Sequence, residues 1–250
     1  MPEYEGLTGE ALARLLGLPR VVALAETEST LDVAHGLAEQ GAPAGTLVVA
    51  DMQRSGRGRM GRAWASMPGQ GVWTTLIERV ADSRALDVLS IRVGLALAEF
   101  LDPIAGETVR LKWPNDLLVA GGKLGGILCE TRWAGQTPSW VAVGVGVNVV
   151  APLGIDGAAG LPRAAARLAV LSAIVSAVRL AAGHRYATGH LHPEELAKFA
   201  ARDALAGARI ASPSAGVAAG IDATGALIVQ TVHGVDAHRT GTVVLAEDYS

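Results

Sequence analysis

One segment, residues 52–70, constrains the fold of this chain more than any other part of its sequence. It contains four glycines and one proline, which disfavour a regular helix or strand: Gly56, Gly58, Gly61, Gly69 and Pro68. Apolar runs typical of buried strands flank it at residues 45–50 and 72–77. We therefore predict a flexible loop that joins two strands.

Four arginines give this loop its charge: Arg54, Arg57, Arg59 and Arg62. Guanidinium groups bind phosphate in a bidentate way, and glycines allow the backbone to close over a ligand, so an anion is the expected ligand. A solvated basic loop is the alternative interpretation. Residues 56–61 also match G-x-G-x-x-G, but no helix is predicted after them, which argues against a dinucleotide-binding fold.

Periodicity predicts further elements along the chain. A helix is expected from Ser29 or Thr30 to about Gln40. The other expected elements are helices at 85–100, 163–182 and 193–206 and strands at 109–113, 123–133 and 140–150. After about residue 205, short β-like runs alternate with glycines, which is typical of a small antiparallel barrel or meander. The predicted fold is α+β, with one domain at residues 1–203 and a small β domain at residues 204–250.

The composition argues against several classes of protein. Of the 250 residues, 50% are hydrophobic and 18% are charged, which is enough apolar material for a packed core. The formal net charge of −3 argues against a nucleic-acid-binding protein. A single cysteine, Cys129, lies in an apolar run and fits a buried thiol in the reducing cytoplasm. The N-terminus does not resemble a secretory signal, and no uninterrupted apolar stretch is long enough for a membrane span.

Two further clusters combine polar residues with strand ends. The first joins Lys112-Trp-Pro-Asn-Asp116 to Lys123-Leu-Gly-Gly-Ile-Leu128. Taken alone, solvated strand-end lysines and a turn at Asp116 explain this cluster as well as a binding site does. In the second cluster, from Val143 to Asn148, glycine alternates with valine and leaves one strand face without side chains, where a flat group or a helix can pack. His190 and His192 have no partner cluster, so no metal site is expected there.

Taken in order, these segments resemble the biotin protein ligase family. The resemblance rests on Glu28-Ser-Thr30, on Q-R-S-G-R-G-R-M-G-R-A-W at 53–64, and on the motifs at 112–116, 123–128 and 144–148. It covers most of residues 26–150, and a weaker similarity in the β region extends to the C-terminus. It implies a class-II-synthetase-like mixed sheet with helices, followed by a small SH3-like β domain. It also implies an enzyme that uses biotin and ATP as substrates with Mg²⁺ and that modifies a biotin carboxyl carrier protein domain.

The resemblance assigns roles to individual residues. Biotin is expected to contact Ser29, Thr30, Gln53, Arg57, Gly58, Arg59, Lys123 and Gly126. The nucleotide is expected to contact Arg57, Arg59, Trp64, Lys123 and Asn148, and the catalytic charges are assigned to Lys123 and Arg59. The family usually has asparagine where this chain has Leu31, so Leu31 contributes only its backbone or its packing. No Mg²⁺ ligand is assigned.

The implied chemistry needs these residue types. The carboxylate of biotin attacks the α-phosphorus of ATP, and Lys123, Arg59 and Mg²⁺ offset the repulsion between the two anions. A carrier lysine then attacks the adenylate carbonyl while the loop at 52–70 keeps water away. Lipoate or octanoate ligases and transferases of the same fold are the nearest alternative, and a nucleic-acid-binding regulator is a further one. Because only 28 residues precede Ser29, we expect no N-terminal helix-turn-helix domain and no specific DNA binding.

Overall fold

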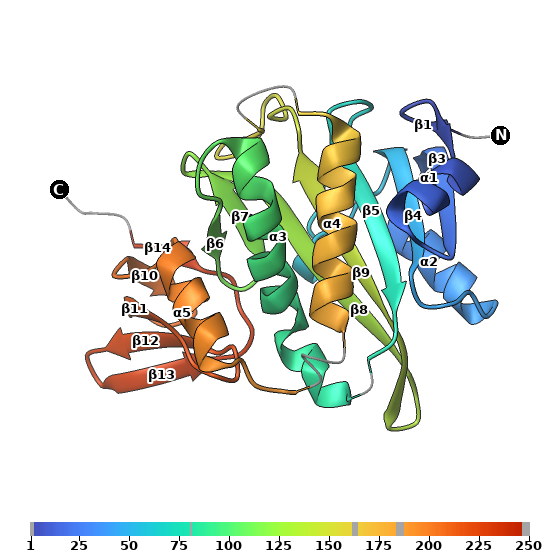
Figure 1. The fold of residues 1–250 in the computed structure, drawn as a ribbon. Coiled ribbons are helices and arrows are strands. Elements are labelled where there is room, and N and C mark those ends of the chain that lie inside the picture. Colours follow the sequence, from blue (N-terminus) through green and yellow to red (C-terminus); the bar gives the residue numbers. More distant parts are fainter. Residues whose placement is uncertain (1–2, 81, 162–164, 184–187, 247–250) are drawn as a thin grey trace.

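The structure is a computed structural model that describes residues 3–80, 82–161, 165–183 and 188–246 (Figure 1). Up to residue 119 the elements are β1 (Glu3–Tyr4), β2 (Leu7–Thr8), α1 (Gly9–Leu16), β3 (Arg20–Thr27), α2 (Thr30–Glu39), β4 (Thr46–Gln53), η1 (Arg59–Gly61), β5 (Gly71–Glu78), η2 (Ser83–Val88), α3 (Leu89–Ala105), β6 (Arg110–Lys112) and β7 (Asp116–Val119). They are followed by β8 (Gly122–Ala134), β9 (Thr137–Asn148), α4 (Arg167–Ala182), α5 (Pro193–Arg202), β10 (Arg209–Ser212), β11 (Gly216–Ile221), β12 (Leu227–Thr231), β13 (Gly234–His238) and β14 (Val244–Leu245).

The larger sheet of the described residues has seven strands in the order β3-β4-β5-β9-β8-β7-β6. It is mixed, because β3 and β4 pair in parallel whereas the other neighbours pair antiparallel. Helices α3 and α4 lie side by side on one face (Figure 1). Leu47 and Val49 of β4 belong to the core on that face, whereas Val48 packs with Ala34 and Ala38 of α2 on the opposite face.

Strand β9 shows most clearly how the sequence separates the two faces. Its valines at 143, 145 and 147 enter the core beneath α3 and α4. Because successive side chains of a strand alternate between faces, Gly144 and Gly146 lie on the face that also carries α2. The predicted strand face without side chains is therefore present, and it faces away from the main core.

A second sheet, of five strands within the described part of the chain, has the order β13-β12-β11-β10-β14 and is antiparallel throughout. It lies beside the β6 edge of the large sheet (Figure 1). The two are in direct contact, since Trp113 Nε1 donates to the carbonyl of Gly225 at 2.9 Å, and Leu227 and Val229 join the same hydrophobic core as the large sheet. The α+β prediction with a C-terminal β region is confirmed, and the domain boundary at 203/204, which falls between α5 and β10, stays a prediction.

Some predicted helix boundaries differ from those of the structure. The helix expected at 85–100 begins as the 3-10 turn η2, and α3 continues to Ala105, where the left-handed Gly106 ends it by donating to the Asp102 carbonyl. The helix expected at 193–206 ends at Arg202, because the Asp203 carboxylate accepts the Leu205 N–H and turns the chain. The start expected at residue 163 lies outside the described residues, and α4 begins at Arg167.

Other elements were not predicted at all. Residues 3–27, for which the sequence pattern predicted no element, form β1, β2, α1 and β3. Asp116, predicted as part of a turn, instead begins β7, a strand too short to show a periodic pattern. Burial raises the pKa of the Cys129 thiol to about 12, which agrees with the buried thiol expected from its apolar run. Among the described residues no helix is long and apolar enough to cross a membrane.

Candidate functional site

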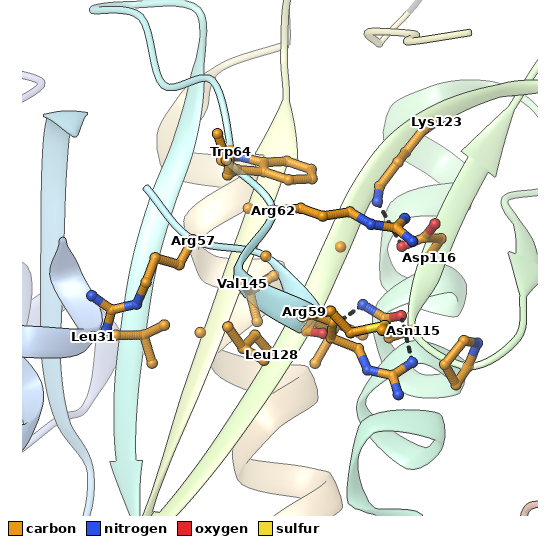
Figure 2. Close-up of a pocket in the computed structure, with 18 of the residues that line it drawn as sticks. Leu31, Arg57, Arg59, Arg62, Trp64, Asn115, Asp116, Lys123, Leu128 and Val145 are labelled. Atoms are coloured by element: carbon orange, nitrogen blue, oxygen red, sulfur yellow. Dashed lines mark hydrogen bonds and ion pairs between the residues drawn. The ribbon is translucent and has the colours of Figure 1, made fainter. Parts of the chain in front are cut away.

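A cavity of about 200 Å³ lies on the glycine face of β9 (Figure 2). Its walls come from the start of α2, from the loop between β4 and β5, from β8 and β9, and from a segment just before β14. We call residues 54–70 the arginine loop. All eight residues predicted to contact biotin line this cavity: Ser29, Thr30, Gln53, Arg57, Gly58, Arg59, Lys123 and Gly126. The structure therefore brings together residues that are spread over about 100 positions of sequence.

The floor of the cavity is flat because three glycines form it. A Cβ atom on Gly146 would come within 2.7 Å of Trp64 Nε1, and one on Gly126 would come within 3.3 Å of Trp64 Cζ3. The indole of Trp64 thus covers part of the side-chain-free face. At the other end of the floor, a Cβ atom on Gly144 would meet Leu31 at 3.4 Å, so Leu31 packs on the backbone there.

The end of the cavity nearest α2 is polar and closed. Gln53 Oε1 accepts from the Thr30 N–H at 2.9 Å and from the Thr30 hydroxyl at 3.0 Å, while Gln53 Nε2 donates to Ser66 Oγ. The Ser29 side chain is 1% exposed, and its Oγ has no hydrogen-bond partner among the described residues. Buried hydroxyl groups are normally paired, so a ligand atom is the missing partner that this geometry accommodates.

Two arginines of the loop are neutralised by carboxylates outside it. Arg54 forms an ion pair with Glu26 of β3, and Arg57 makes two hydrogen bonds of 2.7 Å to Asp32 of α2. The Arg57 guanidinium lowers the pKa of the Asp32 carboxyl below its ordinary value. These side chains fasten the first part of the arginine loop to the body of the protein, and any contact of Arg57 with a ligand stays a prediction.

The apex of the loop, residues 59–62, has a different environment. Arg59 Nη1 lies 3.5 Å from Asn115 Oδ1, and burial lowers the pKa of the Arg59 guanidinium because water is removed without a carboxylate in direct contact. Arg62 donates to the Thr242 hydroxyl at 2.6 Å. Figure 2 shows Arg59 and Arg62 pointing to the opposite side of the cavity from Arg57. The apex therefore supplies the positive charge that an anion in the cavity would meet.

The arginine loop is more regular than its composition predicted. Strand β4 extends to Gln53, an isolated bridge pairs Arg57 with Ala63, and residues 59–61 form a short 3-10 turn. Hydrogen bonds to neighbouring segments explain this order. The N–H groups of Arg54 and Ser55 donate to the carbonyls of residues 27 and 28.

Lys123 lies at the cationic end of the cavity, but it is already paired. Its Nζ is 2.7 Å from Asp116 Oδ1 and 5.2 Å from the centre of the Trp64 ring (Figure 2). Asp116 and Asn115 were not among the predicted site residues, although the Lys112–Asp116 motif contains both. The turn before β7 brings their side chains to the start of β8, a pairing that no local pattern reveals.

Asn148 lies outside this cavity and lines an adjoining cleft of about 690 Å³. The cleft shares Trp64, Lys112, Asp116 and Lys123 with the first cavity, so the two are continuous at the cationic end. The Asn148 amide donates to the carbonyls of Lys123 and Ala159, at 3.3 and 3.0 Å. Its side chain thus fixes the backbone around Lys123, and direct contact with a nucleotide stays a prediction.

The site defines a ligand-binding α+β protein with a closed polar end and a cationic end. The family model described as the Biotin/lipoate A/B protein ligase family matches residues 23–148, and the chain belongs to this family. The resemblance stated from the motifs is therefore confirmed.

Individual relatives agree with this assignment. The bifunctional ligase/repressor BirA of Bacillus subtilis is 43% identical over 122 residues, which make up 48% of this chain and 38% of that protein. The biotin–acetyl-CoA-carboxylase ligase of Paracoccus denitrificans is 41% identical over 128 residues, or 50% of this chain and 53% of that protein. The chain thus matches about half or less of the length of these relatives. The solved biotin protein ligase of Aquifex aeolicus in complex with biotin and ATP has a TM-score of 0.74 at 23% identity, over 90% of this chain and 99% of that one, and this likeness shows the fold.

Proposed function

We propose that this chain is a biotin protein ligase, which uses ATP to form biotinyl-5′-AMP and transfers biotin to a lysine of a biotin carboxyl carrier protein domain. The observation that carries the proposal is the polarity of one cavity: a buried, unpartnered Ser29 hydroxyl at the closed end and the Arg59 and Lys123 cations at the other. The names of the curated relatives, which include a biotin–acetyl-CoA-carboxylase ligase, support it.

Biotin matches this cavity group by group. Its ureido ring carries donors and acceptors that need polar partners in a dry pocket, and the Ser29 hydroxyl supplies one. Its apolar tail runs along the glycine floor, past Leu31 and Leu128 (Figure 2). Its carboxylate then reaches the cationic end, next to the cleft in which the nucleotide binds.

In the first step a carboxylate oxygen of biotin attacks the α-phosphorus of ATP, and pyrophosphate leaves. Both reactants are anions, so preorganised positive charge lowers the barrier. Arg59, which is desolvated, and Lys123, which is beside Trp64, are the cations that supply it. When ATP enters, Lys123 exchanges some of its contact with Asp116 for contact with phosphate.

Mg²⁺ supplies additional charge neutralisation to the triphosphate when it is bound. The described residues contain no group of three acidic, histidine or cysteine ligands. One carboxylate suffices, because Mg²⁺ is commonly held by one or two carboxylates with waters and substrate phosphates. Asp116, with Asn115 beside it in the same wall, would hold the ion at the cationic end.

In the second step the amine of a carrier lysine attacks the adenylate carbonyl, an amide forms, AMP leaves and the amine loses a proton. The closed arginine loop excludes water from the mixed anhydride until the carrier arrives. The free, buried thiol of Cys129 is compatible with a reducing compartment, so we propose that the reaction takes place in the cytoplasm.

The test is transfer of label by the purified protein. With biotin, ATP, MgCl₂ and a biotin carboxyl carrier domain, we expect modification of a single lysine. Lipoate and octanoate are assayed in parallel, and binding to duplex DNA is titrated separately. Absence of biotin transfer to a verified acceptor contradicts the proposal, and transfer of lipoate or octanoate alone assigns the chain to the alternative branch of the family.

Lys123→Ala sharpens the test. Because it removes charge next to the reacting groups, biotin-dependent pyrophosphate exchange should fall about 100-fold or more. Lys198→Ala is the matched control, since this half-exposed lysine of α5 pairs with Glu99 far from the cavity and should have little effect. Near-normal exchange in Lys123→Ala removes this lysine from the mechanism.

A further inference from the structure

The apex of the arginine loop contacts a residue that follows it by about 180 positions. Arg62 Nη2 donates to Thr242 Oγ1 at 2.6 Å. The Thr242 hydroxyl in turn donates to Met60 Sδ at 3.5 Å. One hydroxyl group thus meets two side chains of the apex. Gly241, Thr242 and Val243 also line the cavity, so the C-terminal segment forms part of its wall.

The segment that carries Thr242 is packed against the core, whereas the apex is more exposed. Val243, next to it, is 6% exposed and belongs to the hydrophobic core. A Cβ atom on Gly241 would meet Pro213 at 3.3 Å and Trp113 at 3.9 Å, so the segment is packed against the β6 edge. In contrast, Met60 is 77% exposed.

The apex holds its internal shape through its own backbone hydrogen bonds, from the Gly58 N–H to the Arg62 carbonyl at 2.7 Å and from the Arg62 N–H to the Arg59 carbonyl at 3.3 Å, so an outside contact fixes only its position over the cavity. Met60 has φ +57° and Gly61 has φ +70°, so two consecutive residues adopt the left-handed conformation, which is unfavourable for methionine. Glycines on both sides raise the entropy cost of ordering the loop. Within the described residues, the side-chain hydrogen bonds that residues 59–62 make outside the loop join Arg59 to Asn115 at 3.5 Å, and Arg62 and Met60 to Thr242 at 2.6 and 3.5 Å.

We propose that Thr242 is a positioning residue, which latches the arginine loop closed over the cavity by holding Arg62 and Met60. The segment just before β14 then helps to retain the reaction intermediate in the cavity. This inference rests on the proposed function for its consequence, but the latch itself is a property of the folded protein without ligand. Thr242 acts through Arg62 and does not touch the reacting atoms.

The test replaces only the hydroxyl. Thr242→Val keeps the shape and removes the hydrogen bonds, and Thr242→Ser keeps the hydroxyl. Thr231→Val is the control, because the Thr231 hydroxyl makes its hydrogen bonds to residues 233 and 234 of the β12–β13 turn. In ligand-free protein we expect trypsin to cut after Arg57 and Arg59 about three to ten times faster in Thr242→Val than in wild type, an effect in the range of one ordinary net hydrogen bond, because the contact is exposed to water. Thr242→Ser and Thr231→Val should be cut at the wild-type rate.

The second readout follows the intermediate. With biotin, ATP and MgCl₂, the share of adenylate that escapes and labels an unrelated protein, relative to total pyrophosphate exchange, should rise several-fold in Thr242→Val and return toward wild type in Thr242→Ser. A thermal melt verifies that each variant is folded. Equal digestion of wild type and Thr242→Val overturns the latch, and so does a Thr242→Ser variant as susceptible as Thr242→Val. If the wild-type protein forms no adenylate, the proposed function fails while the digestion still decides the latch.

Discussion

The two halves of the arginine loop carry the same residue types but lie in opposite environments. In the first half, Arg54 and Arg57 are paired with Glu26 and Asp32. At the apex, Arg59 and Arg62 donate to neutral oxygen acceptors, on Asn115 and Thr242. The first half uses its charge to fasten the backbone, whereas in the proposed function the charge of the apex is left for a ligand. A run of alternating glycine and arginine therefore does not define one role.

Burial without a carboxylate partner sets Arg59 apart from the two paired arginines. The Arg54 and Arg57 ion pairs lie at the surface, where water and salt screen such pairs and leave them little net stabilisation. Arg59 is partly desolvated, and the pKa of its guanidinium is lowered by burial. A desolvated cation interacts more strongly with an anion that reaches it. The difference predicts that substitutions in the two halves affect different kinetic constants.

The largest expected effect comes from Arg59→Ala. Removing a desolvated cation from the cavity should lower kcat for biotin-dependent pyrophosphate exchange by about 100- to 1000-fold. Arg57→Ala should raise KM for biotin about tenfold and change kcat much less, because its guanidinium supports the loop through Asp32. Steady-state kinetics give kcat and KM for both variants. Equal losses of kcat would show that Arg57 and Arg59 do not have different roles.

Gly146→Ala tests the floor on which the apex closes. The new Cβ would lie 2.7 Å from Trp64 Nε1 and should displace the indole, which raises KM for ATP about tenfold or more. Gly144→Ala is the comparison for the ATP effect, since its Cβ would meet Leu31 at 3.4 Å and not Trp64. KM values for biotin and ATP measured on both variants provide the check. A Gly146→Ala enzyme with unchanged KM for ATP would show that the position of Trp64 does not affect nucleotide binding.

A smaller effect is expected from removing the ion pair that holds the first half of the loop to α2. Asp32→Asn should raise KM for biotin about three- to tenfold, because Arg57 loses its charged acceptor. The double exchange Asp32→Arg with Arg57→Asp restores an ion pair and should recover part of the loss. Glu26→Gln, in the more exposed pair with Arg54, should change KM less than twofold. If KM for biotin in the exchange variant is as high as in the worse of the two single variants, Asp32 and Arg57 do not act as a pair.

The smallest effect is an acid dependence of stability. The pKa of Asp32 is lowered in the folded state by Arg57, so its contribution is fully present above the unfolded value of about 3.9 and is lost as the pH falls through the folded value. Wild type should therefore melt slightly above Asp32→Asn at pH 7, and the gap should close below about pH 4. Thermal melts of both proteins from pH 7 to pH 3 measure it, and a gap that widens in acid contradicts the assignment.

What the sequence could predict depended on how local the signal was. The alternation at Val143 to Asn148 predicted a bare strand face, because side chains of a strand alternate with period two. The motifs also identified the residues that line the cavity, including Ser29 and Gln53. The fold class followed from the change in glycine spacing after about residue 205.

Partners that come together through long-range pairing were not predictable in this way. Asp116 meets Lys123 only because β7 pairs with β8, and Thr242 meets Arg62 only because the C-terminal sheet packs on β6. Arg57 looked like a free cation because its carboxylate, Asp32, lies 25 positions earlier on a helix. Elements of two to four residues, such as β1 and β7, are too short to carry a periodic pattern.

The intrinsic fluorescence of Trp64 should report whether a ligand occupies the cavity. Its ring is set edge-on to Trp73 with centroids 6.3 Å apart, and the ammonium group of Lys123 lies 5.2 Å from its centre. The emission of an indole depends on nearby charge and on neighbouring rings. A molecule that draws Lys123 toward itself or stacks on Trp64 therefore changes the intrinsic fluorescence. The native protein thus carries its own reporter of occupancy, and binding can be titrated without an attached dye.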